Sequence, residues 1–319
     1  MEVIEVRGGS VTERAVVQKA ITPAMSDQMY RSSYERIAGY VVPAAALDGV
    51  TDLPTLFEAH ALRFPGSPYD DDRPLDVIRF PAESSLNIER ASGGRDAHEA
   101  RRNGGAFVEH APFTGTGFTA AQGRSVPLYW VPTHRPPVGA ELWRYPGSSA
   151  PEFRARYGGA AEGWVFRSDL EESRPAHGRD LSRFTGGLAS VGGNVYIADV
   201  VGDLVDIVTT DPAAPAVFGA PRCGVRSARV SRDAIEGYFE LDVRTEHNGV
   251  EFRITGQRRD PTLGPVLEGT SLTHNVQILE GLGLTKIDAG VYEADLPLAL
   301  LDTARTETLQ LPGWPGAGT

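Results

Sequence analysis

The chain has 319 residues and a formal net charge of −11, with 41% hydrophobic and 23% charged residues. This composition is that of a folded protein rather than a disordered one, and the negative charge disfavours nucleic acid or an anionic membrane as main partner, because both are polyanions. The length exceeds what one hydrophobic core usually supports, which predicts two domains.

The basic residues are nearly all arginine. Of the 31 basic residues only Lys19 and Lys286 are lysines, a bias typical of a GC-rich bacterial genome, so each arginine carries less functional information. The single cysteine, Cys223, excludes an internal disulfide. Neither a signal peptide nor an apolar run of about 20 residues is visible, which predicts a cytoplasmic protein.

The opening third predicts helices where it is regular. Apolar residues recur at helical spacing from Val11 to Ala20, and a second helix is expected from Ser26 to Ile37, before a strand at Gly39–Val42. A third helix is expected to begin at Thr51-Asp52, with Pro54 in its first turn as helix starts favour.

Strands dominate from there to about residue 170. Turn dipeptides separate them at short intervals, which favours an antiparallel sheet over alternating βαβ units. The expected strands are Asp76–Phe80, Ala106–His110, Pro127–Val131, Ala140–Tyr145 and Gly163–Phe166. The polar stretch Ser168–Asp180, which contains Pro175 and Gly178, is the predicted linker.

Two hairpins are expected in the second half. Apolar and polar residues alternate in Phe239–Val243 and again in Val250–Ile254, and Asn248-Gly249 between them supplies a positive-φ turn. This pattern predicts an amphipathic hairpin with one buried face. A second hairpin is expected at Asn194–Val201 and Leu204–Thr209.

The last elements complete a predicted α+β fold of mostly antiparallel sheets with a few short helices, in two domains. A helix is expected at Leu272–Glu280, a strand at Gly290–Asp295 and a short helix at Pro297–Ala304. Residues 1–170 would form an N-terminal α+β domain with a helical start and a Trp-rich sheet. Residues 181–310 would form a C-terminal antiparallel β domain with one helix, followed by a flexible tail at 311–319.

The segment Leu128–Phe166 holds three of the four tryptophans, together with several tyrosines and arginines. Aromatic and arginine side chains are favoured at binding surfaces, although the same residues could form an ordinary sheet core. Strand alternation places Glu141, Trp143 and Tyr145 on one face. The predicted binding residues are Trp130, His134, Trp143, Arg144, Tyr145 and Trp164.

Motifs for metals and cofactors are weak. The seven histidines show no zinc-binding spacing, and the consecutive Asp70, Asp71 and Asp72 in a turn cannot all converge on one ion. Phe113–Ala120 has the glycine spacing of a dinucleotide loop, but no helix follows to face a pyrophosphate, so a β-turn is favoured. No metal and no cofactor are predicted.

One order of residues points to a different function. Arg79 on a strand, Thr116 near a later strand and Glu141 on another resemble the core of ADP-ribosyltransferases over residues 75–145. In that family the arginine binds the NAD phosphates, the Ser/Thr strand shapes the nicotinamide pocket, and the glutamate holds the ribose. The Glu-x-Glu or Gln-x-Glu pair of the family is absent here. His110 is an acid/base candidate in the same region.

The sequence therefore favours a non-catalytic binding protein that recognises a protein or peptide through the aromatic and arginine-rich sheet surface. A net charge of −11 would steer a basic partner toward it. The alternative is an NAD-consuming enzyme, an ADP-ribosyltransferase-like protein or an NAD glycohydrolase, with NAD as its cofactor and Arg79, Thr116 and Glu141 in its site.

Overall fold

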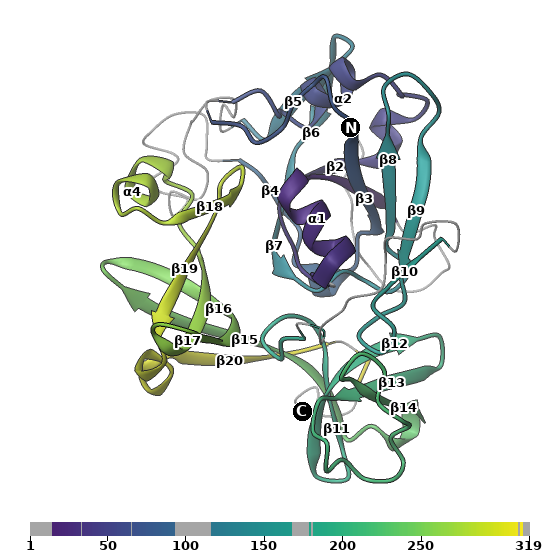
Figure 1. The fold of residues 1–319 in the computed structure, drawn as a ribbon, viewed down its shortest axis with the longest axis vertical. Helices are drawn as coiled ribbons and strands as arrows, with labels where there is room; N and C mark the ends of the chain where they lie inside the picture. The colour runs from purple at the N-terminus through teal and green to yellow at the C-terminus, as the bar shows by residue number, and fades with distance from the viewer. Residues whose placement is uncertain are drawn as a thin grey trace.

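The computed structural model describes residues 15–32, 34–64, 66–92, 116–167, 179, 181–311 and 313–314. Their strands form one sheet of eight strands, one of ten and a separate two-stranded hairpin, and every strand pair among them is antiparallel (Figure 1). Helices in this part of the chain are few and short. The prediction of mostly antiparallel sheets with a few short helices is confirmed.

The first sheet carries a helix on each face. Its strands are β1 (Val16–Ile21), β2 (Ile37–Pro43), β3 (Leu75–Pro81), β4 (Glu89–Arg90), β7 (Tyr129–His134), β8 (Glu141–Tyr145), β9 (Glu152–Tyr157) and β10 (Trp164–Phe166). They lie in the order β10-β9-β8-β3-β1-β2-β7-β4. Helix α1 (Pro23–Ser32) packs in the cluster that holds Ile78, and helix α2 (Leu53–Ala59) in the cluster that holds Val77. Since Val77 and Ile78 point to opposite faces, both faces are covered.

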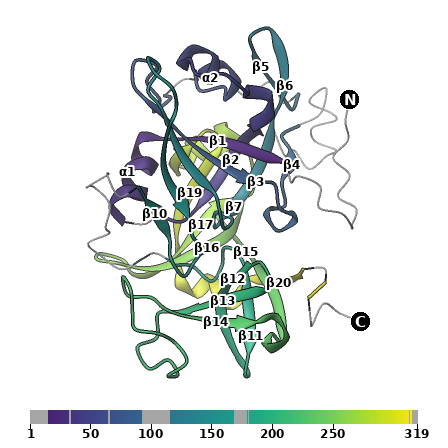
Figure 2. The same cartoon turned by 90° about the vertical axis from the view of Figure 1, so that its right-hand side faces the viewer.

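The second sheet is built almost entirely from the second half of the chain. Its strands are β11 (Leu188–Val191), β12 (Asn194–Val201), β13 (Leu204–Thr209), β14 (Arg226–Ser231), β15 (Gly237–His247), β16 (Val250–Asp260), β17 (Gly264–Ser271), β18 (Thr285–Asp288), β19 (Val291–Pro297) and β20 (Arg305–Gln310). The hairpin of β5 (Phe118–Ala121) and β6 (Arg124–Pro127) packs near α2. Figure 2 shows that hairpin at one end of the molecule and β11–β14 at the other.

The helix expected at Val11–Ala20 is wrong where the structure describes it, because residues 16–21 form strand β1. This strand lies between β2 and β3 with both faces covered, and Val17 to Ile21 are all buried. A strand buried on both faces does not alternate apolar and polar residues, so its sequence resembles a buried helix.

The other expected helices differ mainly at their ends. α1 begins at Pro23 and stops by Ser32, and Ile37 already belongs to β2. The start of α2 is confirmed, since the Asp52 side chain accepts a hydrogen bond from the Thr55 amide at 2.9 Å. The C-terminal pair is shorter than expected: α4 spans Val276–Gly281 with Asn275 as its cap, and Leu298–Thr303 forms a 3-10 helix.

Both expected hairpins are confirmed, but the idea that β15–β16 buries a single face is wrong. Asn248 and Gly249 have φ of 52° and 76°, as the tight turn requires. Glu240, Asp242 and Arg253 were expected on the wet face and are buried, because the first sheet covers that face.

Some predicted features fall outside the described residues. These are the strand Ala106–His110, nearly all of the linker Ser168–Asp180 and most of the tail. Where helices are described, none combines the length and the apolar character needed to cross a bilayer.

Candidate functional site

The aromatic segment is mostly core rather than surface. Trp130, His134, Tyr145 and Trp164 are all buried, so the prediction that they form an exposed binding surface is wrong for these four. The reason is that each of them packs against other side chains: Trp130, for example, lies edge-on against the rings of Tyr40 and His274, and Trp164 contacts the ring of Tyr157. Of the six predicted binding residues, only Trp143 and Arg144 remain partly exposed.

Arg144 has a structural partner. Its guanidinium donates two hydrogen bonds of 2.8 Å to the buried carboxylate of Asp76, which also accepts a hydrogen bond from Ser26. The Arg144 charge is therefore already paired inside the protein, and it lies on the opposite face of β8 from Trp143.

Trp143 adjoins Arg79, and this contact is the centre of the candidate site. Arg79 of β3 lies directly opposite Glu141 of β8, so their side chains share a face with Trp143. The Arg79 guanidinium lies 5.5 Å from the Trp143 ring centroid and 5.8 Å from that of Tyr145. Nε of Arg79 donates to the side chain of Gln18 at 3.2 Å, and Nη2 donates to the Tyr145 hydroxyl.

These contacts fix the guanidinium without neutralising it. Gln18 and the Tyr145 hydroxyl are neutral groups, and burial raises the pKa of Tyr145 while Arg79 acts in the opposite direction. Among the described residues no carboxylate is paired with Arg79. A partly exposed cation stacked on two aromatic rings is thus held ready for an anionic group.

The surroundings of Arg79 form a continuous patch on β3, β8, β9 and β10. Trp143 lies edge-on to Phe153 with ring centroids 5.6 Å apart, and its Nε1 donates to Glu141 at 3.0 Å. Arg156 pairs with the other oxygen of Glu141 at 3.2 Å, and Val165, opposite Arg156, is 46% exposed. We call Arg79, Glu141, Trp143, Phe153, Arg156 and Val165 the Arg79–Trp143 face.

The residues of the ADP-ribosyltransferase resemblance are brought together only in part. Arg79 and Glu141 are neighbours across two strands. Thr116 instead bridges to Ser92, next to β4, and three strands separate β4 from β3 in the sheet. His110 lies outside the described residues.

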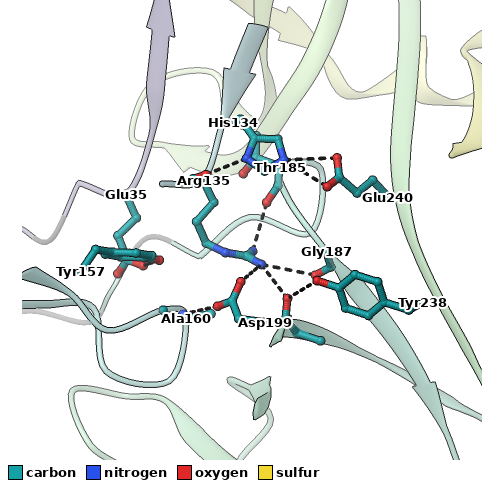
Figure 3. A network of polar contacts seen from close by, with 12 residues as sticks. Glu35, His134, Arg135, Tyr157, Ala160, Thr185, Gly187, Asp199, Tyr238 and Glu240 are labelled. Carbon is teal, nitrogen blue, oxygen red and sulfur yellow. Dashed lines mark hydrogen bonds and ion pairs between the residues drawn. The ribbon is translucent and has the colours of Figure 1, made fainter. Parts of the chain in front are cut away.

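His134 belongs to a second polar cluster, which lies between the two sheets (Figure 3). Its Nε2 lies 3.1 Å from the Glu240 carboxylate, and its Nδ1 lies 2.6 Å from the Arg135 carbonyl oxygen. Burial acts to raise the pKa of Glu240, but His134, Arg253 and Arg135 together outweigh it and hold that pKa below its ordinary value. Both partners are buried, so the pair ties β7 to β15.

Arg135 reaches further into the second sheet. It donates to the carbonyls of Thr185 (3.0 Å) and Ala198 (2.9 Å) and to the Asp199 carboxylate (2.9 Å). The second Asp199 oxygen accepts from the Ala160 amide at 2.5 Å. Figure 3 shows the guanidinium enclosed by these acceptors.

Glu35 forms the third part of this junction. Arg179 donates two hydrogen bonds to its carboxylate, at 2.5 and 2.6 Å, and the Tyr157 hydroxyl donates a third at 2.5 Å. We call the pairs His134–Glu240, Arg135–Asp199 and Glu35–Arg179, of which only Asp199 is not fully buried, the inter-sheet seam. The carboxylates of these pairs accept hydrogen bonds from protein donors, and a satisfied polar network of this kind makes the fold more rigid.

No known protein family, curated protein or solved structure matches the chain significantly.

The remaining motifs add no site. The carboxylates of Asp70, Asp71 and Asp72 come within 4.8 Å of one another but are exposed, and two of them pair with Arg73 and Arg63. We assign no metal to this loop. In the glycine-rich segment, strand β5 begins directly after Gly117, so in the described residues a strand and not a helix follows the glycines.

Proposed function

We propose that this chain is a binding protein that recognises a partner protein through the Arg79–Trp143 face, and that the partner supplies a carboxylate to Arg79. The observation that carries the proposal is the partly exposed Arg79 guanidinium, which is held by Gln18 and Tyr145 and has no anionic partner in the described chain. Trp143 and Phe153 beside it offer apolar contact area.

Preorganisation supports this role. An arginine that is already fixed and stacked loses little conformational freedom on binding, and its planar fork matches a carboxylate. Tryptophan and arginine are also the residues that most often dominate the energy of protein interfaces. Trp143 and Arg79 are in contact, so one partner group could engage both.

A basic partner is compatible with this face, because its long-range attraction and its local contacts depend on different charges. The net charge of −11 steers a basic protein toward the chain. At the contact itself Arg79 and Arg156 outnumber Glu141. We therefore propose a partner that is basic overall and presents an Asp, a Glu or a C-terminal carboxylate to Arg79.

Peptide display tests this function. Libraries of random peptides selected on the wild-type protein are expected to yield peptides with an acidic residue or a required C-terminus. Their affinity should fall at least about tenfold, or 1.4 kcal/mol, in Arg79→Gln and in Trp143→Ala, because each removes a central contact. Fluorescence anisotropy measures the affinity.

The matched control for that experiment is Arg305→Gln, an exposed arginine of β20 outside the face. It is expected to leave peptide affinity unchanged, and circular dichroism should show all variants folded. Selected peptides that lack a carboxylate, or that bind Arg79→Gln as well as the wild type, would contradict the proposal.

A second candidate is an NAD-consuming enzyme, and the positions of Arg79 and Glu141 directly opposite each other on β3 and β8 support it. If this function holds, incubation with NAD should release nicotinamide, and Glu141→Gln should abolish the release while leaving the fold intact. Chromatography of the reaction measures the product. An unchanged NAD concentration in the wild type rejects this candidate and leaves the peptide-binding proposal standing.

We further propose that the two sheets belong to two domains that meet at the inter-sheet seam. Each sheet has apolar clusters largely its own: α1 and α2 pack on the first, and Phe252 and Leu279 lie in a cluster of the second. Val291 is a contact across the boundary, since it belongs to a cluster of the first sheet.

A further inference from the structure

A cavity of about 620 Å³ lies between the first turns of α1 and strands β17, β19 and β18, which form one end of the second sheet. Figure 1 labels α1 and these strands. We propose that this cavity binds a small zwitterion, of amino-acid to tripeptide size, which carries both a cationic and an anionic group. None of its lining residues belongs to the Arg79–Trp143 face, so the proposal does not depend on the function proposed above.

The cavity has the size and position of a ligand site. Its volume falls within the roughly 300–1,000 Å³ typical of small-molecule pockets, which often lie between domains. Met25, Tyr34 and Ile287 line it with apolar surface that suits the hydrocarbon part of a ligand. The charged residues in its lining determine which charged groups a ligand can carry.

Lys286 supplies a cation to the cavity. Its ammonium lies 3.2 Å from Glu280, whose side chain is half exposed, and 5.1 Å from the ring centroid of Phe64. An ammonium has three donors, so this one hydrogen bond leaves donor capacity for a ligand anion.

The carboxylates of the lining are Glu268, Asp288 and Glu293. Asp288 is bonded by Lys19 and by the Tyr69 hydroxyl. Glu268 is paired with Arg36 at 2.5 Å, and Arg36 itself lines the cavity.

Residues of both charge signs therefore line one cavity. A ligand with only one sign of charge would be placed beside like charges and would lose the water that screens them, which costs affinity. A zwitterion can place its anion toward Lys286 and its cation toward the carboxylates. The mixed lining thus selects molecules such as free amino acids and short peptides with both termini uncapped.

The test uses the full-length protein and a panel of the twenty free amino acids and a library of free tripeptides. Thermal shift identifies binders, and calorimetry measures their affinity. At least one zwitterion is expected to bind, and its N-acetylated and its C-amidated forms are each expected to bind at least tenfold more weakly. Failure of the whole panel, or equal binding of the capped forms, overturns the proposal.

Variants locate the binding. Ala24→Trp fills the cavity from an exposed position of α1, and Lys286→Met removes the cation, so each is expected to reduce affinity at least tenfold. Arg31→Met, at an exposed position near the other end of α1, is the control and should bind normally. Unchanged binding in Ala24→Trp overturns the proposal, and normal binding in Arg79→Gln separates this site from the Arg79–Trp143 face.

Discussion

Replacing Arg135 with methionine is expected to lower the free energy of unfolding by about 3–5 kcal/mol, because one member of a buried ion pair is lost while the other stays. The substitution leaves the Asp199 carboxylate without its guanidinium and removes the donor for the carbonyls of Thr185 and Ala198. Urea unfolding followed by fluorescence and circular dichroism measures the change.

The matched control is Arg305→Met, in which an exposed arginine loses its pairing with the exposed Glu307. Surface pairs contribute little, so this variant should stay within about 0.5 kcal/mol of the wild type. If Arg135→Met were as stable as this control, the seam would not hold the sheets together as described.

Lowering the pH from 7 to 5 is expected to reduce the free energy of unfolding by about 4 kcal/mol through two buried histidines. Burial, with a smaller contribution from Lys19, lowers the pKa of His60 from 6.5 to about 3, and burial lowers the pKa of His274 to about 4. At pH 5 both are protonated in the unfolded chain and neutral in the folded one. The unfolded state then binds more protons, so acid favours unfolding by about 2 kcal/mol for each histidine.

Two carboxylates modify the acid response in opposite directions. The lowered pKa of Glu240 adds to the loss of stability as the pH falls. Burial raises the pKa of Glu35, although Arg179 acts in the opposite direction, and this raised pKa reduces the loss of stability. Urea unfolding at pH 7 and pH 5 should therefore compare the wild type with the double variant His60→Gln, His274→Gln. The variant is expected to lose about 4 kcal/mol less between the two pH values, and equal slopes would contradict the burial of these rings.

Short-range sequence patterns correctly predicted the elements that a turn or a helix cap defines. The β15–β16 hairpin follows from alternation and the Asn-Gly turn, and the start of α2 follows from Asp52. Strand β1 could not be predicted this way. Its Gln18 and Lys19 are fully buried, and their partners His60 and Asp288 lie 42 and 269 residues away.

The same distinction applies to the sites. Alternation in β8 correctly placed Glu141, Trp143 and Tyr145 on one face, and the order of Arg79, Thr116 and Glu141 along the chain singled out Arg79. The seam was missed because its partners are far apart in sequence, 144 residues for Glu35 and Arg179. Because the sequence is rich in arginine, no local pattern distinguished the few buried arginines from the exposed ones.

The ionic character of the inter-sheet seam has a consequence for how the chain is made. The strands of the first sheet are synthesised before Asp199 and Glu240. Arg135 and His134 therefore stay hydrated until these partners have been synthesised. Charged groups hydrate readily, whereas an apolar contact surface left bare would attract other nascent chains. These charged contacts leave less apolar surface bare in the half-finished molecule than apolar contacts in their place would, and their desolvation becomes a late step of assembly.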